Sequence, residues 1–326
     1  MKRLSRFAMV LGLIALIGSS PAFAAVPDLG DAADFAILAF GTNPGIAGLD
    51  TSSNSVVTGD IGIGPAGTYH TSGVSQITGN AFLYSNVTSG DDPGEHTGDP
   101  GTIQQDAVPG GPIDTYLDGA IADALAAATF TGALAPTQTF GDINNAYVDA
   151  NDTDPNPAHG NANLVGNGGI NVIKLNKIDL SGNRTLTLQG GANDYFIFQF
   201  GDDGVIDLSG SSAIAFGGAT PNHILWYFSD PGPQLTWLAG IDLSGTVLAP
   251  NRKVRFHGNL INGALITNFA DIGSSGDVTY NPFQPPPPPG QEPPPNGPVI
   301  PEPSSLLLLG MGLAGFQRGA RRFRRA

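Results

Sequence analysis

The hydrophobic positions of this chain come in short runs that alternate with polar residues and end at glycine. Val56 to Gly64 and Gln76 to Leu83 carry similar patterns at an offset of 20 residues. The phrase Ile-Asp-Leu-Ser-Gly recurs at 178–182, 206–210 and 241–245, at offsets of 28 and 35. Its alternation places Ile and Leu on one face of a strand and Asp and Ser on the other, and glycine suits the turn that follows.

Repeats of this length predict a mostly β fold in which small units stack, because a single unit cannot bury its own apolar face. Unequal offsets predict coils of variable length. A sandwich of short strands is an alternative that period-2 alternation and glycine-rich turns also fit. We favour a β-solenoid because the repeated phrase includes its corner.

One segment, Ile113 to Ala128, has the spacing of an amphipathic helix instead. Asp114 is a candidate to cap its start. We expect the helix to lie along the flank of the solenoid, with an apolar stripe that serves packing. The predicted stripe comprises Tyr116, Leu117, Ala120, Ile121, Ala124 and Leu125.

Two runs, Tyr195–Phe200 and Ile224–Phe228, are apolar with little alternation, which predicts strands buried on both faces. The Asp-, Asn- and Pro-rich stretch from Asp149 to Asn163 predicts a loop. After Phe283 the composition changes to proline, as in an extended spacer, so we expect the folded body to end near Phe283.

The N-terminus has the three parts of a secretory signal peptide. Basic residues precede an apolar stretch from Phe7 to Ile17, and Ala22-Phe23-Ala24 forms a small-x-small cleavage site. The apolar stretch is too short for a membrane anchor, which needs about 18 residues. The predicted organisation is a signal peptide (1–24), a solenoid body (25–283), a Pro-rich linker (284–298) and a C-terminal tail (299–326).

The predicted body is strongly acidic. Residues 25–283 hold 26 Asp and Glu against 6 Lys and Arg, and the remaining basic residues lie in the terminal segments. Such a surface repels nucleic acid and anionic lipid headgroups, whereas divalent cations or a neutral partner remain open. The chain has no cysteine, so no disulfide can stabilise it after export.

The tail consists of Pro301-Glu302-Pro303, an apolar stretch from Leu306 to Phe316, and five arginines up to Arg325. It resembles the Pro-Glu-Pro C-terminal (PEP-CTERM) sorting signal of exopolysaccharide-producing Gram-negative bacteria. That resemblance implies an exosortase-like enzyme as partner, and delivery to the cell surface or extracellular matrix. The apolar stretch is 11 residues against about 20 for a comfortable span, which suits transient association with the inner membrane.

The body is similar to two related families. Leu29 to Leu38, Val57 to Gly62, the predicted helix and Asn193 to Gln199 resemble bacterial ice-binding-protein-like β-solenoids, and Gly245–Asn251 with Ile261–Ile266 looks like the choice-of-anchor A group. Together they imply a right-handed β-solenoid with one flanking helix, and an exported binding or adhesive role.

Patterns that would carry catalysis or cofactors are weak. Gly62 to Gly67 has dinucleotide-binding glycine spacing, but no helix pattern follows it. Asp152-x-Asp154-x-Asn156 begins like a calcium loop but lacks its glycine and its closing glutamate. Asp202 and Asp203, with Asp194 and Asp207, are the carboxylates that an enzymatic alternative would use. We predict no catalytic residue, no cofactor and no metal site.

Ice binding remains an alternative, because it needs only a flat, rigid face of small polar and apolar groups. The candidate outward residues for a ligand or ice face are Thr185, Thr187, Ser209, Ser211, Ser244 and Thr246. We predict an exported, non-catalytic surface or matrix protein with a binding or adhesive role, whose partner is exopolysaccharide or ice. An ice-binding protein and a β-solenoid carbohydrate-active enzyme are the alternatives.

Overall fold

The computed structural model describes residues 26–41, 48–52, 54–73, 75–89, 101–145, 161–201, 204–229, 231–237, 242–257, 260–273 and 276–286. Apart from Pro286, they belong to one compact unit that ends at Pro285. The expected signal peptide, nearly all of the linker and the tail lie outside the described residues. So does most of the loop expected from Asp149 to Asn163, whose last residues instead begin a strand.

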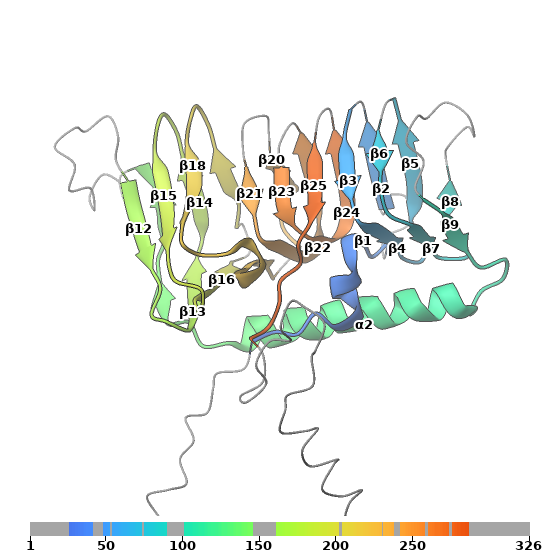
Figure 1. Cartoon of the computed structure of the whole chain (residues 1–326), viewed down its shortest axis with the longest axis horizontal. Coiled ribbons are helices and arrows are strands. Elements are labelled where there is room, and N and C mark those ends of the chain that lie inside the picture. Colours follow the sequence, from blue (N-terminus) through green and yellow to red (C-terminus); the bar gives the residue numbers. More distant parts are fainter. Residues whose placement is uncertain are drawn as a thin grey trace, which may run out of the picture. The chain divides into compact units, whose positions relative to one another are not determined.

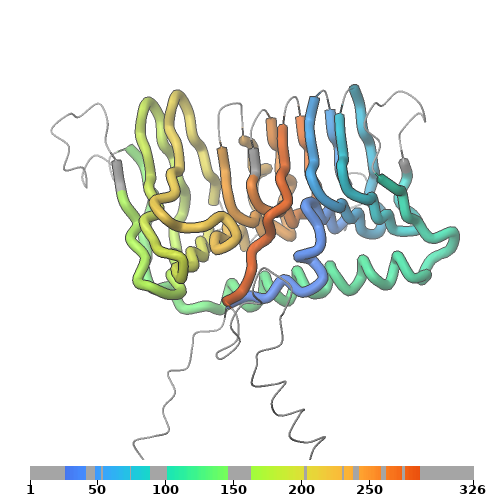
Figure 2. The backbone as a smooth tube through the Cα atoms, in the orientation of Figure 1, coloured from blue at the N-terminus to red at the C-terminus, as the bar shows by residue number. Residues whose placement is uncertain are grey.

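The strands form the β-solenoid expected from the repeats, with three sheet faces and parallel pairing between successive coils (Figures 1 and 2). The first face, called the helix face, uses only the first halves of the two long strands β22 and β24. Its strands, in spatial order, are β10 (Gln138–Thr139), β13 (Ile170–Leu175), β16 (Tyr195–Phe200), β19 (Ile224–Phe228), β22 (Thr246–His257), β24 (Leu265–Gly273), β1 (Phe35–Ala39), β4 (Asp60–Ile63), β7 (Ala81–Leu83) and β9 (Ile103–Gln105).

The second face, called the ladder face, continues each coil after a bend and includes the second halves of β22 and β24. Its other strands are β11 (Asp142–Asn144), β14 (Lys177–Leu180), β17 (Ile206–Leu208), β20 (Leu235–Trp237), β2 (Gly48–Ser52), β5 (Thr68–Ser72) and β8 (Thr88–Ser89).

The third face, called the threonine face, closes each coil. Its strands are β12 (Asn161–Val165), β15 (Thr185–Gln189), β18 (Ala213–Gly217), β21 (Leu243–Ser244), β23 (Leu260–Gly263), β25 (Asp277–Tyr280), β3 (Val56–Thr58) and β6 (Gln76–Ile77).

The chain enters this stack in the middle. A 3-10 turn, η1 (Gly30–Asp34), leads into β1, which pairs with β24 on one side and β4 on the other. The coils then run to the end formed by β8 and β9, where helix α2 (Pro112–Ala133) begins. After the helix, the coils from β10 onwards build back towards β1, with a second 3-10 turn η2 (Pro221–His223) before β19. Strands from the two halves of the chain therefore meet at a seam between β24 and β1.

The repeated phrases lie where stacked coils need them. Ile178–Leu180 pairs in register with Ile206–Leu208, and Val56 and Ile61 pair with Gln76 and Ala81, at the expected offset of 20 residues. The third phrase ends at a different corner. Gly182 and Gly210 turn from the ladder face towards the threonine face, whereas Gly245 turns from the threonine face to the helix face. All three have positive φ, of 79°, 69° and 108°, which glycine adopts at little cost.

Two apolar clusters explain why Tyr195–Phe200 and Ile224–Phe228 carry almost no polar residues. One side of these strands points into the solenoid, where Phe198 stacks on Trp226 with ring centroids 4.2 Å apart. The other side, including Ile197 and Leu225, packs beneath helix α2. Both strands are buried throughout, as the sequence predicts.

Helix α2 extends from Pro112 to Ala133, longer at both ends than expected, and covers the helix face (Figure 1). It is about 33 Å long at about 1.5 Å per residue. Leu117, Ala120, Ile121 and Ala124 are buried as predicted, but Leu125 is 42% exposed. The buried stripe continues instead through Ala127, Ala128 and Thr131, because the helix crosses the strands and these small residues permit close approach.

The cap of this helix differs from the expectation at Asp114. The N-cap residue is Gly111, and Asp114 lies buried inside the first turn. Asp106 supplies the capping carboxylate, because its Oδ2 accepts hydrogen bonds from the backbone N–H groups of Ile113 at 2.8 Å and Asp114 at 2.9 Å. A Cβ at Gly111 would lie 2.3 Å from Cγ of Asp106, so this approach requires glycine.

Candidate binding faces

Helix α2 covers one of the three sheet faces, and the described residues place no helix over the other two (Figure 1). Thr185, Thr187 and Ser244 lie on the threonine face, half-buried between neighbouring coils. Ser209 and Ser211 are exposed at the corner before that face. The predicted set thus falls on one face and its border, with one exception.

Thr246 is the exception, and its expected outward position is wrong. It begins β22 on the helix face and is 0% exposed. Its Oγ1 accepts a hydrogen bond of 2.7 Å from the backbone N–H of Phe283. The phrase Gly245-Thr246 turns the corner, and alternation across a corner does not preserve which residue faces outward.

Strand register shows which polar rows align on the threonine face. Asn161, Thr185 and Ala213 form one row, and Asn163, Thr187 and Ala215 form the next. Further along the stack a third row contains Ser244, Asn262, Thr279 and Thr58. Asn262, Thr279 and Thr58 could not be selected from the sequence, because the pairing of β25 with β3 joins segments more than 200 residues apart.

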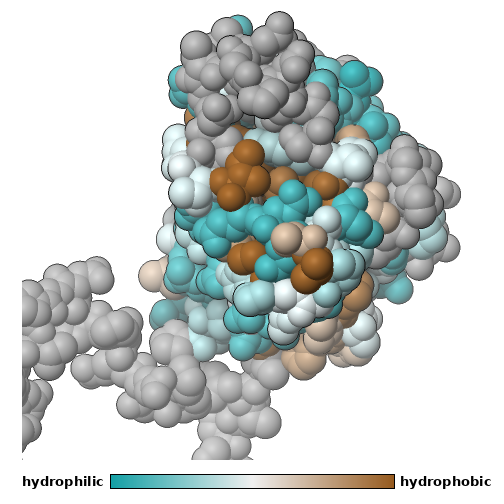
Figure 3. All heavy atoms as spheres, turned by 90° about the vertical axis from the view of Figure 1, so that its right-hand side faces the viewer, coloured by the Kyte–Doolittle hydropathy of each residue, from teal (hydrophilic) through white to brown (hydrophobic). Residues whose placement is uncertain are grey.

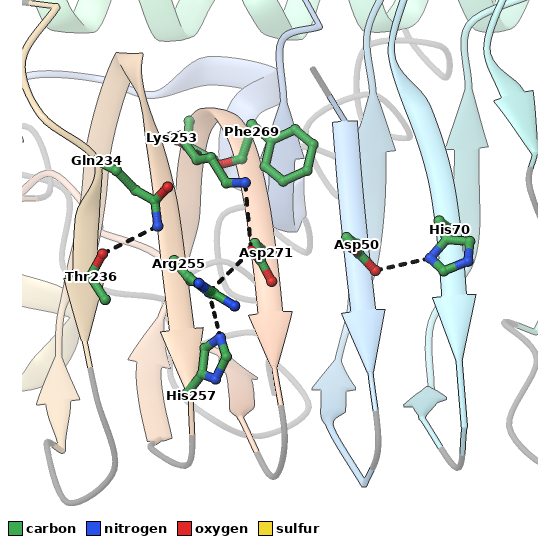
Figure 4. Close-up of polar contacts among 10 residues, drawn as sticks. Asp50, His70, Gln234, Thr236, Lys253, Arg255, His257, Phe269 and Asp271 are labelled. Atoms are coloured by element: carbon green, nitrogen blue, oxygen red, sulfur yellow. Dashed lines mark hydrogen bonds and ion pairs between the residues drawn. The ribbon is translucent and has the colours of Figure 1, made fainter. Parts of the chain in front are cut away.

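The ladder face carries a different chemistry, shown in Figure 4. One residue from each of five neighbouring strands falls in the same row, and we call this row the polar ladder. It consists of Thr236, Arg255, Asp271, Asp50 and His70. Successive rungs lie about 4.8 Å apart, the spacing of paired strands.

Polar contacts connect two pairs of neighbouring rungs, Arg255 with Asp271 and His70 with Asp50, and others lie beside the row (Figure 4). Arg255 Nε donates to Nε2 of His257 at 2.8 Å and lies 3.3 Å from Asp271 Oδ2. Lys253 Nζ approaches the same Asp271 oxygen at 3.6 Å. At the other side, His70 Nδ1 lies 3.0 Å from Asp50 Oδ1. The exposed pairs contribute little stability, so their arrangement matters mainly for the surface they present.

An aromatic ring lies beside this row. Phe269 is two residues before Asp271 on β24, points to the same side, and is only partly buried. Lys253 Nζ lies 4.3 Å from the centroid of its ring, within the range of a cation–π contact. The ladder therefore places an accessible apolar ring among donors and acceptors.

The far part of the ladder face is more acidic. Asp179 and Asp207 lie in one row on neighbouring coils, next to Asn144. Lys177 Nζ donates to Asp179 Oδ2 at 2.8 Å, and this hydrogen bond and ion pair raise the pKa of Lys177 above its ordinary value. Among the described residues, no group of three His, Asp or Glu side chains is placed to hold a metal ion.

The end of the stack at β8 and β9 offers a mixed surface. Figure 3 views this end, and its apolar patches are separated by hydrophilic side chains. Ile103 on β9 is 54% exposed and Val108 is 66% exposed. Within the described residues, this end of the stack thus presents a sheet edge of mixed polarity.

The carboxylates considered for catalysis are not brought together where they are described. Asp194 is buried and accepts hydrogen bonds from the backbone N–H groups of Gly168 at 2.7 Å and Gly191 at 2.8 Å. Asp207 lies on the ladder face, while Asp202 and Asp203 lie outside the described residues. The arrangement gives Asp194 a structural role at a turn.

Two other sequence patterns resolve simply. Residues 62–67 form the end of β4 and a turn, with no helix following. The Asp152–Asn156 segment lies outside the described residues. No helix in the described part of the chain has both the length and the apolar character needed to span a membrane.

Comparison with known proteins identifies both parts of the chain. Residues 29–280 match the family model described as "Putative Ice-binding-like adhesive domain". The chain belongs to this family. Residues 299–325 match the PEP-CTERM protein-sorting motif, which implies processing by an exosortase and export to the surface or exterior of a bacterium. No curated protein matches the chain.

Solved structures with similarity to this adhesive-domain protein include three ice-binding proteins. One, from the Antarctic ascomycete Antarctomyces psychrotrophicus, is 24% identical, covers 79% of this chain and 99% of its own, and has a TM-score of 0.49. LeIBP from an Arctic yeast is 21% identical. The match covers 83% of this chain and 96% of LeIBP, with a TM-score of 0.49. The ice-binding protein from an Antarctic Flavobacteriaceae bacterium is 21% identical. The match covers 82% of this chain and 49% of that protein, with a TM-score of 0.46.

Proposed function

We propose that this protein is an exported, non-catalytic adhesin of the bacterial surface or extracellular matrix, retained through its C-terminal sorting motif. The observation that carries the proposal is the ladder face, a sheet surface that no described helix covers and that displays donors, acceptors and an aromatic ring in register. Its rigidity comes from parallel ladders and a continuous core, so the surface is ordered before a partner arrives.

The position of the last described residues supports this assignment. Phe283 packs in the cluster beneath helix α2, and Gln284 pairs with Asn222 next to it. The chain therefore leaves the body on the helix side. The last described residues therefore do not lie over the ladder face or the threonine face.

Cell attachment provides the test. The full chain is produced in an exopolysaccharide-forming Gram-negative host, with the sorting variant Glu302→Ala and the ladder variant Arg255→Gln as a matched pair. We expect Glu302→Ala to reduce the chain retained at the surface, and Arg255→Gln to reach the surface normally but attach less. If cells that lack the chain attach as well as cells that carry it, the adhesive assignment is refuted.

Ice binding is the second candidate, and the threonine face is the observation that favours it. The row Ser244, Asn262, Thr279 and Thr58 is uncharged and lies on a regular parallel sheet. We expect thermal hysteresis from the purified chain if this face binds ice, and its loss in Thr279→Lys or Thr187→Lys. Arg255→Gln on the ladder face is the control and should leave the hysteresis unchanged. Absence of hysteresis in the parent chain removes this candidate.

A further inference from the structure

The charges of the polar ladder compensate one another. Arg255 in the ladder and Lys253 beside it face Asp271, and His70 faces Asp50. With the histidine left out of the count, the ladder and Lys253 together hold two positive and two negative side chains. The surrounding body is different, with 26 acidic and 6 basic residues between positions 25 and 283. A polyanion is repelled by this field over the whole surface, whereas a neutral polymer meets no such barrier.

The ladder still has hydrogen-bonding capacity to offer. Arg255 has a side chain that is 47% exposed and contacts Asp271 and His257 through Nε. A guanidinium group carries four further N–H donors on its Nη atoms, which can serve a partner. Asp50, with a side chain 45% exposed, presents carboxylate oxygens in the same row, two strands away from Arg255. A partner that suits this surface must both donate and accept, as hydroxyl groups do.

Phe269 sets a third requirement for the partner, in addition to neutral charge and the capacity to donate and accept hydrogen bonds. A ring on an outward sheet position costs exposed apolar area unless a partner covers it. A pyranose ring has an apolar face of C–H groups and a rim of hydroxyls, so it can pack on Phe269 while its hydroxyls reach Arg255 and Asp271. Lys253 lies over part of the ring and can move aside, because its side chain is long and partly exposed.

We propose that the polar ladder binds a neutral, hydroxyl-rich polysaccharide that lies across the strands, with one sugar stacked on Phe269. Its hydroxyls exchange hydrogen bonds with Arg255, Asp271 and Asp50 on successive rungs. This inference rests on the proposed adhesive function and assigns it a site and a class of partner. The regular rung spacing of about 4.8 Å suits a polymer, since several units bind at once.

Affinity electrophoresis of the purified full chain tests the assignment. Gels contain hydroxyethylcellulose or dextran as neutral polymers, or alginate as the anionic one. We expect a neutral polymer to retard the chain, and this retardation to persist in about 0.5 M salt. Salt at that concentration screens charge pairs but not stacking or hydroxyl contacts. Arg255→Gln and Phe269→Ala should each weaken it about tenfold, in line with the loss of a central contact.

Two control variants define the site. Lys177→Gln changes a charge on the same face but in the acidic part near β11, and Thr187→Ala changes the threonine face. Both should bind as the parent chain does. Far-UV circular dichroism and the unfolding midpoint establish that each variant is folded, and Arg255→Gln, at an exposed position, carries the test if Phe269→Ala does not fold.

The outcomes separate this inference from the function on which it rests. Retardation by alginate alone, lost in salt, overturns the neutral-polymer assignment in favour of an anionic partner. Neutral-polymer binding that survives in both ladder variants overturns the site. No binding to any of these polymers, with cell attachment still dependent on the chain, overturns the inference and leaves the adhesive function in place. Absence of both polymer binding and chain-dependent cell attachment refutes the adhesive function as well.

Discussion

Thr246 shows how a polar residue on a strand can serve the core rather than the surface. It is fully buried, and its hydroxyl accepts the hydrogen bond of the Phe283 N–H where the chain after β25 packs beneath helix α2. Thr246→Val preserves shape but leaves that buried N–H unsatisfied, which costs about 1–3 kcal/mol. We expect the free energy of unfolding in urea to fall by that amount. Thr187→Val, at an outward position, is the control, and an equal loss there would contradict the argument.

Asp194 makes stability depend on pH. Burial opposes its ionisation, but hydrogen bonds from Gly191, Gly168 and Asn171 outweigh burial and hold its pKa below the ordinary value. A depressed pKa in the folded state contributes stability that is complete above the unfolded pKa of about 3.9 and is lost as pH falls through the folded value.

The corresponding variant is Asp194→Asn, whose amide nitrogen cannot accept the second backbone hydrogen bond. We expect it to unfold at lower urea concentration than the parent chain at pH 7, and the difference to shrink as pH falls below about 4. Urea titrations at several pH values measure this. A difference that is independent of pH would show that the charge of Asp194 does not stabilise the turn.

At the scale of elements, helix α2 depends on side chains outside itself at both ends. Asp106 accepts hydrogen bonds from two N–H groups of the first turn, and Gln199 Nε2 donates to the carbonyls of Thr131 at 2.6 Å and Leu134 at 3.0 Å. These groups satisfy backbone atoms that a helix cannot pair internally. Both also connect the helix to the strands or to the loop beside them.

Asp106→Ala should therefore destabilise the fold by about 1–2 kcal/mol, as expected for loss of an N-terminal cap. Asp106→Asn retains an acceptor oxygen and should recover part of that loss, the remainder being the interaction of the charge with the helix dipole. Chemical unfolding followed by circular dichroism at 222 nm measures both. If Asp114, the residue that the sequence suggested, were the cap, Asp106→Ala would have no effect.

The strands and the helix were largely predictable from the sequence, but the pairing of each strand with its neighbours was not. Alternation and glycine corners indicated the coils, the spacing of Leu117 to Ala124 indicated the helix, and the apolar runs indicated buried strands. Register between coils depends on long-range pairing, as in Asp277 with Val56, and no local pattern encodes it. The polar ladder was missed for this reason, since its five rungs are dispersed from Asp50 to Asp271.

At the scale of the whole molecule, the chain begins and ends its described part at the middle of the stack. β1 pairs with β24 and β4, and Tyr280 Oη donates to the backbone carbonyl of Ala33 at 2.7 Å. Open solenoids contact only sequential neighbours and can unfold coil by coil. Here the seam joins the first coils to the last, and helix α2 joins the two outer ends, so the coils should unfold together.

Ile37 tests this coupling, because it is fully buried at the seam and pairs with Leu265 on one side and Ile61 on the other. In the parent chain, far-UV circular dichroism and fluorescence of Trp226 and Trp237 should give one midpoint. Ile37→Ala costs about 2–5 kcal/mol at the seam and should separate them. The shorter N-terminal strands then unfold first, while both tryptophans, packed in the C-terminal coils, report a later transition.

Leu83→Ala is the matched control, since Leu83 is equally buried in β7 but away from the seam. It should lower both midpoints together, because the seam still transmits the loss to the C-terminal coils. If circular dichroism and fluorescence still give the same midpoint in both variants, β1 does not couple the N-terminal coils to the C-terminal coils. Helix α2 alone then couples them. If the parent chain already shows two midpoints, the halves are independent, and the adhesive faces then belong to two separately stable units.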